Sequence, residues 1–465
     1  MDELTKRQTN IKLTYESAEF LIKNLQNESQ TSLLQKIPKN FCKTRFSGYL
    51  CDDMKKLMTI LVCVAALFAC HSCKTPGEAP VRKVVMIIID GVPTDMIERL
   101  HPEAIYDIAS HGAFGVSYVG GEVGSYSQTP TISAVGYNTM LTGTWANKHN
   151  MWGNSGEPNY NYWSMFRIAK EQEKPLTTGL FSSWTDNRTV LLGEGLESNA
   201  GMKIDYVGDG YDLDEVAFPH KDMELHVFDY DEAASTAAAE CIRNDAPDLS
   251  WVYLWYTDDA GHIKGNGEYF DEYTLKADEQ IRRVWDAVQY RQESFNEDWM
   301  VIVTTDHGRT TDGHGHGGQS ARERGSWIAV NQAVGTRFKN GGAAMVDINP
   351  TVCQFLGMEV PLRVRMEQDG ISFIGETIIS NMNAIPYDDT AILTWDSHVE
   401  GKDVTVYMAK ANDYRTTGQE DWKELGTVKS GDGIFKVDLA KAGDSDFYKF
   451  ALVTEHECLN RWLQN

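Results

Sequence analysis

The residues best suited to chemistry lie between Val301 and Gly318, where four β-prone residues lead into an aspartate and several histidines. The stretch reads VIVTTDHGRTTDGHGHGG, and its carboxylate and imidazole side chains are Asp306, His307, Asp312, His314 and His316. A strand that brings a carboxylate and an imidazole to its C-terminal end, followed by more histidines, is typical of a metal site beside a parallel sheet. Taken alone, these letters also suit a capping turn and a solvated, glycine-rich loop.

Two earlier segments end in the same kind of side chain. The apolar run KVVMIIIDG ends in Asp90, and LSWVYLWYTDDAGH ends in Asp258 and His262. A D-x-x-x-H spacing places both of its side chains within reach of one ion. For Asp90, a helix cap is an equally good interpretation of the aspartate alone.

A hydroxyl-rich segment supplies a candidate nucleophile. In SQTPTISAVGYNTMLTGTWANKHNMWGN, small residues precede the helical text AVGYNTML, so Ser133 is expected near a helix N-terminus. Free backbone N–H groups there favour an anion, which suits both an ionised nucleophile and a bound phosphoryl oxygen. A serine that only caps the helix is the structural alternative.

The elements that must position these side chains alternate between strands and helices. Further strands are expected in KPLTTGLFSSW and SWIAVN, and helices in PTDMIERLHPEAIYDIASHG and from Tyr269 to Gln289. This alternation predicts an α/β sandwich with a largely parallel central sheet, here residues 80–383.

Composition restricts the partners. The 465 residues carry a formal net charge of -24, with a pI near 4.9, which argues against a nucleic-acid duplex as partner. An acidic surface repels anionic substrates, so their binding would need a local cation such as a metal ion. Five of the eight cysteines lie at or before Cys73, and Cys241, Cys353 and Cys458 are too scattered for a zinc site. Any metal is therefore expected on Asp and His.

The N-terminal part has the composition of an export signal. Lys55 and Lys56 precede an apolar run over 57–69, and Cys70 and Cys73 follow. The run is too short to span a bilayer comfortably and is similar to a bacterial lipoprotein signal peptide over 54–73, with either cysteine as the lipidated residue. A buried core helix is the alternative. Translation is then expected to begin at Met54, which makes residues 1–53 a mis-assigned upstream extension. The protein is expected in the periplasm or on the outer membrane, with membrane contact only through the lipid anchor.

The C-terminal part, residues 388–465, has a different pattern. Short alternating runs separated by Gly, Asp and Ser predict a small antiparallel β-sandwich that loosely resembles a fibronectin type III module. We expect it to act as a spacer or packing partner, with glycan binding as the alternative. The runs are AILTWDSH, DVTVYMAKA, WKELGTV, GIFKVDL and FYKFALVTE.

In order and type, the chemical residues resemble those of the alkaline phosphatase superfamily, and in particular its nucleotide pyrophosphatase/phosphodiesterase branch. That branch places a glycine, a histidine and an asparagine ten, sixteen and twenty-one residues after its nucleophile, and Ser133 is followed at these spacings by Gly143, His149 and Asn154. The branch usually has threonine as nucleophile, so Ser133 departs towards the phosphatases. The segment from Asp347 to Thr351 resembles the D-I-x-P-T motif that precedes the last helix of the superfamily.

The resemblance implies two divalent ions, most plausibly zinc, about 4 Å apart. One would be held by Asp90, Asp306, His307 and the Ser133 oxygen. The other would be held by Asp258, His262 and His316, with His314 as the alternative to His316. Ser133 would attack phosphorus and form a phosphoseryl intermediate, while Asn154 would donate to a nonbridging phosphoryl oxygen.

The substrate class follows from departures within the superfamily. Phosphatases proper carry a glutamate where this chain has Tyr253, and sulfatases need a proline and an arginine that are missing after Ser133. A phosphodiesterase or nucleotide pyrophosphatase acting on a small nucleotide, lipid or glycan ester is therefore predicted. A phosphomonoesterase, a phosphoethanolamine-type transferase and an inactive surface binding lipoprotein remain alternatives.

Aromatic and basic residues near the motifs offer weaker signals. Five aromatic residues could stack on a base or sugar, although core packing is the usual role of such side chains. The three arginines after Asp306 could touch substrate, although a solvated loop is the expectation for each. These residues are Tyr126, Tyr137, Trp145, Trp152 and Trp163, and Arg309, Arg322 and Arg324.

Overall fold

A computed structural model of the chain describes residues 79–443 and 445–464. The predicted upstream extension (1–53), the predicted signal peptide (54–73) and both candidate lipidation cysteines lie outside these residues. Among the helices of the described part, none combines the length and the apolar content needed to cross a bilayer.

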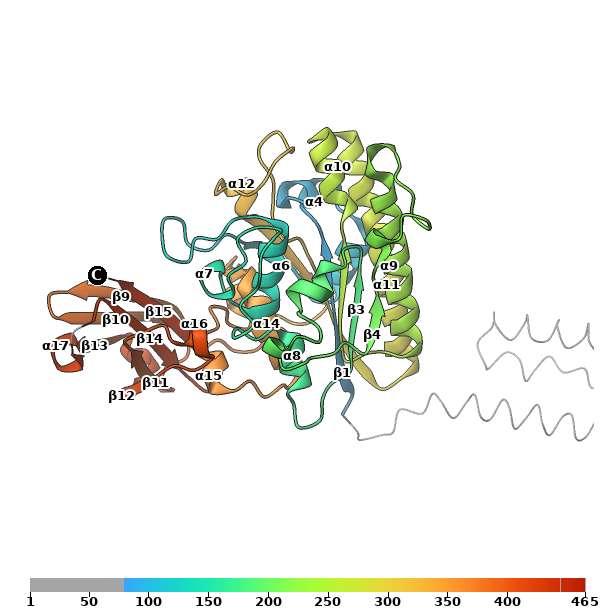
Figure 1. Ribbon diagram of the computed structural model, residues 1–465. Helices are drawn as coiled ribbons and strands as arrows, with labels where there is room; N and C mark the ends of the chain where they lie inside the picture. Colours follow the sequence, from blue (N-terminus) through green and yellow to red (C-terminus); the bar gives the residue numbers. More distant parts are fainter. Residues whose placement is uncertain (1–78, 444, 465) are drawn as a thin grey trace, which may run out of the picture. The chain divides into compact units, whose positions relative to one another are not determined.

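An eight-stranded sheet forms the centre of the α/β unit (Figure 1). Strand β7 runs antiparallel to both of its neighbours, and every other neighbouring pair is parallel, which confirms the predicted largely parallel sheet. In spatial order the strands are β4 (Tyr206–Gly208), β3 (Thr178–Ser182), β5 (Leu249–Leu254), β1 (Val81–Ile89), β6 (Glu297–Thr304), β7 (Gly325–Val330), β2 (Ala113–Tyr118) and β8 (Ala343–Ala344).

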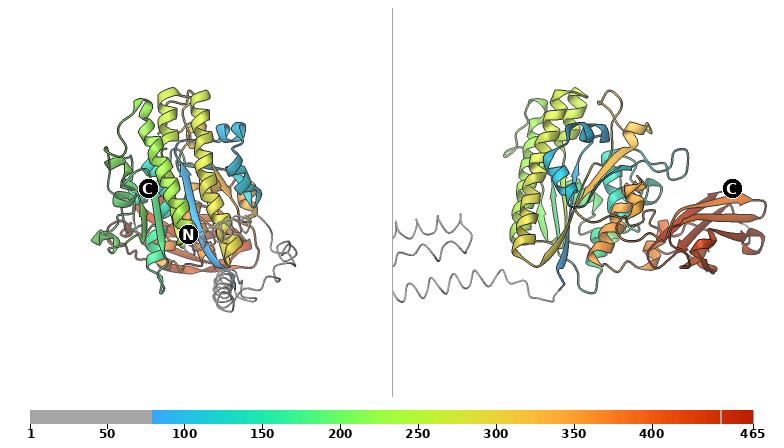
Figure 2. Two further views of the ribbon diagram at one scale, coloured as in Figure 1. Left: turned by 90° about the vertical axis from the view of Figure 1, so that its right-hand side faces the viewer. Right: turned by 180° about the vertical axis from the view of Figure 1, so that it is seen from behind.

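Helices cover both faces of this sheet, which explains why β1 reads as a continuous apolar run. Val84, Met86 and Ile88 belong to one core, and the alternate residues of the same strand belong to the other. The first face is covered by α6 (Ser133–Thr142), α8 (Met165–Lys170) and α14 (Ile348–Leu356). The second is covered by α4 (Thr94–Leu100), α5 (Glu103–Ser110), α9 (Leu225–Asn244), α10 (Tyr256–Lys264) and α11 (Glu268–Ser294), as Figure 2 shows from two sides.

Shorter helices complete the α/β unit. The helical text after Asp90 forms two helices because Pro102 cannot donate a backbone hydrogen bond, and His101 ends α4 with a positive φ of 52°. The remaining short helices are α7 (Ala146–His149), η2 (Asn187–Leu191), η3 (Glu197–Asn199), η4 (Tyr211–Leu213), η5 (Asp222–Glu224), α12 (Ala321–Arg324), α13 (Thr336–Lys339), η6 (Met345–Asp347) and α15 (Leu362–Arg365).

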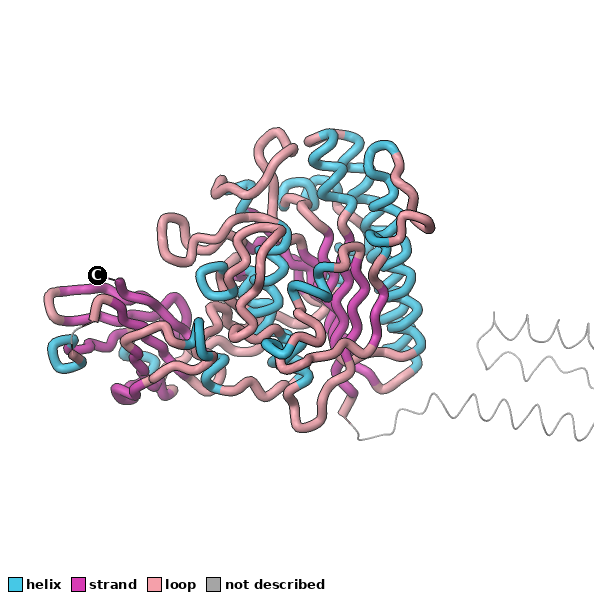
Figure 3. Tube along the Cα trace, viewed as in Figure 1, coloured by secondary structure: helices cyan, strands magenta, loops and turns pink. Residues whose placement is uncertain are grey.

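The C-terminal part is a two-sheet antiparallel β unit, as predicted (Figure 3). One sheet has the order β13 (Ile434–Asp438), β10 (Thr390–Ser397), β9 (Ile379–Tyr387). The other has the order β12 (Lys423–Lys429), β11 (Asp403–Ala409), β14 (Phe447–Val453), β15 (Cys458–Gln464). Both sheets contribute to one apolar core, which contains Leu393, Val406 and Phe450. The connections include α16 (Tyr414–Thr417), η7 (Ser430–Asp432) and α17 (Leu439–Ala442).

Candidate active site

The predicted site residues meet where three adjacent strands end. Strand β1 pairs with β5 on one side and with β6 on the other, so the segments that follow these strands leave the same edge of the sheet. Asp90 follows β1 directly, Asp306 follows β6, and Asp258 lies in α10 just after β5. All three carboxylates are buried, as is His307.

Asp90, Asp306 and His307 form the first group of candidate ligands. The Nε2 atom of His307 lies 3.4 Å from Asp90 Oδ1 and 3.3 Å from Asp306 Oδ2. Ser133, the first residue of α6, places its Oγ 3.4 Å from the same Nε2 atom. The helix can approach this closely because Gly136 faces Asp306, where an added Cβ would lie 2.8 Å from the Asp306 carbonyl oxygen.

Asp258, His262 and His316 form the second group. Asp258 and His262 are one turn apart on α10, and His262 Nε2 lies 3.1 Å from both Asp258 Oδ2 and His316 Nε2. The rings of His307 and His316 stack with centroids 3.8 Å apart, so the two groups adjoin. His314 is turned towards the backbone of α10, with Nδ1 3.0 Å from the His262 carbonyl oxygen. The geometry therefore favours His316 over His314 as a ligand.

The three candidate histidine ligands, His262, His307 and His316, share one hydrogen-bond arrangement. In each of the three rings Nδ1 lies at hydrogen-bond distance from a backbone carbonyl oxygen, so Nδ1 carries the proton and Nε2 presents a lone pair. The Nε2 atoms of His262 and His316 face each other. Two lone pairs cannot form a hydrogen bond with each other, but both could bind a cation between them. The pairs are His307 with Gly308 (2.9 Å), His316 with Thr131 (3.0 Å) and His262 with His314 (2.6 Å).

The carboxylates of the first group also fit a divalent cation. Asp90 Oδ1 and Asp306 Oδ2 are buried and have no hydrogen-bond partner. Burial raises the pKa of Asp90 well above its usual value and that of Asp306 to about 7, because ionised carboxylates are costly in this apolar surrounding. A bound divalent cation would stabilise both charges and give the two orphaned oxygens a partner.

Two tyrosines hold the other oxygen of Asp90. Tyr253 donates to Asp90 Oδ2 at 2.6 Å, and Tyr137 donates to the same oxygen. Burial raises the pKa of both phenols well above the usual value, so they remain donors. The contact of both tyrosines with Asp90 could not be predicted from the sequence, because it forms only when β5 pairs with β1 and α6 packs beside them.

Arg309 corrects a sequence-based expectation. It does not lie in a solvated loop but is fully buried, and its guanidinium donates to Asp258 Oδ1, to the Asp258 carbonyl oxygen (2.7 Å) and to that of Gly91 (2.9 Å). Burial alone would raise the pKa of Asp258, but the guanidinium brings it below its usual value. Arg322 and Arg324 are partly exposed and donate to the carbonyl oxygens of Thr310 and Gly121.

The three residues that follow Ser133 at the family's spacing have different surroundings in the structure. Asn154 Oδ1 accepts from the N–H of Ala134 at 3.1 Å, which places the asparagine beside the start of α6. Gly143 ends α6 with a positive φ of 69°. His149 is buried between the Met151 N–H and Thr139 Oγ1, and burial lowers its pKa to about 3. Of these three residues, only Asn154 is hydrogen-bonded to the residue next to Ser133.

Most of the aromatic candidates pack in the interior. Tyr137, Trp145 and Trp163 are buried, and Tyr126 stacks on Trp462 with ring centroids 5.0 Å apart. Trp152, two residues before Asn154, is 50% exposed and is the member of this set that is free to contact a substrate.

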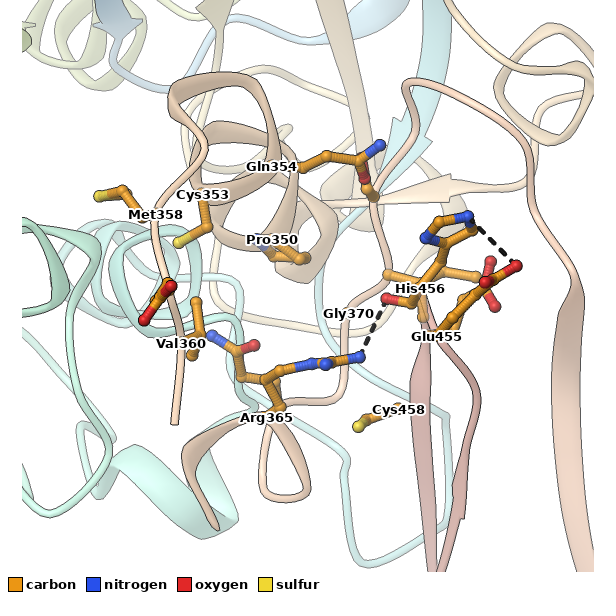
Figure 4. A pocket seen from close by; sticks show the side chains of 15 residues that line it. Pro350, Cys353, Gln354, Met358, Val360, Arg365, Gly370, Glu455, His456 and Cys458 are labelled. Carbon is orange, nitrogen blue, oxygen red and sulfur yellow. Dashed lines mark hydrogen bonds and ion pairs between the residues drawn. The ribbon is translucent and has the colours of Figure 1, made fainter. Parts of the chain in front are cut away.

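Two other features lie apart from the site. A cavity of about 600 Å³ is lined by Cys353 of α14, Cys458 of β15 and Arg365 (Figure 4). Arg365 donates to the His456 carbonyl oxygen at 3.2 Å. None of the ligand candidates lines this cavity. A third group of potential ligands, which the sequence did not single out, lies at the start of α9. It consists of the exposed His220 and Glu224 and the buried His226.

The comparisons with known proteins agree with this geometry. Residues 84–367 match the family model described as type I phosphodiesterase / nucleotide pyrophosphatase. None of the curated proteins compared with the chain matches it.

Several solved structures are similar at low identity. A 2-O GAG sulfatase is 14% identical over 78% of this chain and 86% of its own, with a TM-score of 0.45. Phosphonoacetate hydrolase from Sinorhizobium meliloti is 16% identical over 50% of this chain and 59% of its own, with a TM-score of 0.36. Murine ectonucleotide pyrophosphatase / phosphodiesterase 5 is 12% identical over 60% of this chain and 96% of its own, with a TM-score of 0.38.

The family match covers more than half of the chain, and the matched range contains all of the gathered aspartates and histidines and Ser133. It confirms the resemblance expected from the motifs. The chain belongs to the type I phosphodiesterase / nucleotide pyrophosphatase family and is a phosphoric ester hydrolase.

Proposed function

We propose that this protein hydrolyses phosphodiester or pyrophosphate bonds of small phosphorylated substrates, with Ser133 as the nucleophile. The observation that carries the proposal is that Ser133 Oγ lies 3.4 Å from His307 Nε2, at the edge of two adjoining groups of aspartate and histidine. A phosphate ester that reaches Ser133 would therefore lie beside the first group of candidate ligands, which adjoins the second.

The residues of the chain have distinct tasks in this reaction. Ser133 begins α6, and the positive end of the helix dipole there favours the negative phosphoryl group. The amide of Asn154 is held beside Ala134 and can donate its own N–H to a nonbridging phosphoryl oxygen. Two divalent cations held by the two groups, which we propose to be zinc, would supply Lewis acidity and lower the pKa of the serine hydroxyl.

The bond changes follow a double displacement. Ser133 Oγ releases its proton to solvent and bonds to phosphorus, while the bond from phosphorus to the leaving oxygen breaks and that oxygen takes up a proton from solvent. Water then attacks the phosphoserine, releases the phosphoryl product and returns a proton to Ser133. Because phosphate diesters are anionic and the chain has a formal charge of -24, the cations would also overcome repulsion of the substrate.

The test compares p-nitrophenyl phosphodiester, phosphomonoester and sulfate substrates with the purified protein. We expect the diester to be the best substrate, Ser133→Ala to lower turnover by about a thousandfold or more, and a chelator to abolish activity until zinc is returned. Ser110→Ala, an exposed serine on α5, is the matched control and should leave turnover unchanged. Preference for the sulfate, or full activity of Ser133→Ala, would contradict the proposal.

We also propose that the protein is exported and anchored by a lipid on Cys70 or Cys73. The support is the signal-like composition of residues 54–73. Expression of Cys70→Ser and Cys73→Ser in a bacterial host with radiolabelled fatty acid would identify the modified cysteine. Labelling that persists in the double variant, or is absent from the parent, would refute the anchor.

A further inference from the structure

Arg309 places a permanent positive charge against one of the two ligand groups. Its side chain is fully buried, and the only carboxylate that it contacts in the described part of the chain is Asp258. Its remaining hydrogen bonds go to carbonyl oxygens of Gly91 (2.9 Å), Asp258 (2.7 Å) and Gly313 (3.3 Å). The ring of Phe270 lies beneath the guanidinium, 5.3 Å from its carbon to the centroid.

The surrounding backbone prevents the guanidinium from moving away. A Cβ added to Gly261 would lie 2.4 Å from Arg309 Cζ, and one added to Gly91 would lie 2.8 Å from Nη2. Glycine at both positions lets α10 and the turn after β1 close directly onto Arg309. The charge is therefore a fixed part of the site.

The two groups differ in charge, and Arg309 widens the difference. The first group has two carboxylates, Asp90 and Asp306, and no lysine or arginine is ion-paired with either within the described residues. The second group has one carboxylate, Asp258, and its Oδ1 is occupied by Arg309. With ionised carboxylates and neutral histidines, the formal charge of the first group is -2. That of the second group is -1 without Arg309 and zero with it.

We infer that Arg309 increases the difference between the two groups, so that the first holds a divalent cation tightly and the second binds one weakly and exchanges it. The inference rests on the proposed metal-dependent function. Only Asp258 Oδ2 remains for a cation in the second group, and the guanidinium repels that cation across a buried, poorly screened distance. Activity would then follow the free metal concentration through occupancy of the second group.

The test is a calorimetric titration of chelator-stripped full-length protein with Zn²⁺ alone. His220→Ala is present in every sample, so that the third group, at α9, does not add a third binding event. We expect two binding steps whose dissociation constants differ by about tenfold or more. Two steps of equal affinity would overturn the inference, whereas absence of any binding would overturn the proposed metal-dependent function instead.

Two substitutions at Arg309 separate its charge from its shape. In Arg309→Met the weak step should tighten by about tenfold. In Arg309→Lys, which keeps the charge, the difference between the two zinc dissociation constants (the affinity gap) should remain. Arg188→Met removes a partly buried arginine that is paired with Asp209 and Glu194 away from the site, and should leave both steps unchanged.

Each outcome decides the question. Loss of the weak step in a folded Arg309→Met protein would mean that Arg309 orients Asp258 instead of weakening the second group. Closure of the gap in Arg309→Lys would exclude charge as the cause. If circular dichroism shows that Arg309→Met does not fold, the gap in the parent protein and in Arg309→Lys still decides.

Discussion

At the scale of single residues, each candidate ligand is held by a partner that leaves one atom free. In Asp90, Oδ2 accepts hydrogen bonds from the two tyrosines, whereas Oδ1 has no hydrogen-bond partner. Each histidine uses Nδ1 on a backbone carbonyl and keeps Nε2 for the site. Such outer partners fix ligand geometry before an ion arrives, which lowers the reorganisation needed on binding.

Removing one outer partner should weaken the site without removing a ligand. In Tyr253→Phe, Asp90 Oδ2 loses its 2.6 Å hydrogen bond, and zinc affinity and turnover should each fall by about 10- to 100-fold. Calorimetry and steady-state kinetics provide the two measurements. Tyr160→Phe removes a phenol that donates to Val190, away from the ligand groups, and should change neither. Unaltered zinc affinity in Tyr253→Phe would show that Tyr137 alone orients Asp90.

At the scale of elements, the start of α10 is set by a carboxylate on α9. Asp231 accepts from the backbone N–H groups of Trp255 and Tyr256, both at 2.8 Å, and from the hydroxyl of Ser183. It therefore ties the ends of β3 and β5 to the helix that carries Asp258. The sequence offered no sign of this role, since Asp231 lies in an ordinary helical segment.

Burial raises the pKa of Asp231 to about 7, against about 3.9 in an unfolded chain. Between these values the native state binds more protons than the unfolded state, so the contribution of Asp231 to stability is complete below about pH 4 and is lost as the pH rises through 7. We therefore measure the free energy of unfolding in urea for the parent and for Asp231→Asn. Between about pH 5 and pH 8 the parent should lose stability relative to Asp231→Asn. Asp229→Asn, which changes a more exposed aspartate of α9, is the control. A pH-independent difference would contradict the assignment.

At the scale of the whole described molecule, buried ion pairs join the α/β unit to the β unit. Lys449 on β14 is fully buried between Glu367 (2.6 Å) and Glu420 (2.9 Å). Lys148 on α7, also buried, donates to Asp369 and, at 2.7 Å, to Asn460 on β15. The β unit is thus bound directly to the helix that follows α6, and we expect the two units to unfold together.

Lys449→Met should leave two buried carboxylates without their cation and destabilise the protein by about 3–5 kcal/mol. The measurement is chemical unfolding followed by fluorescence. Lys402→Met, which removes an exposed pair with Glu455, should leave the free energy of unfolding nearly unchanged. A cost for Lys449→Met as small as that of the control would mean that water replaces the lost cation.

The amino-acid sequence alone was enough to predict the kind of fold and the residue types at the ends of the central strands. Buried parallel strands read as apolar runs, and their ends carry Asp90, Asp258 and Asp306, because strand polarity is a local property of the chain. The spacing after Ser133, compared with that of the resembling family, pointed to Asn154, which is hydrogen-bonded to Ala134 at the start of α6. The predicted strands β10 to β14 appeared for the same local reason.

Which of the remaining polar side chains lie among the candidate ligands depends on how distant segments pack. The motif pattern favoured His316 but left His314 open, and no local signal separates a buried Arg309 from a solvated one. Each of these arrangements is defined by contacts with α10 more than 40 residues away. The same holds for the two tyrosines on Asp90 and for Lys449 on Glu367. Such pairs depend on which surfaces meet when layers pack, and that information is absent from the periodicity of any single segment.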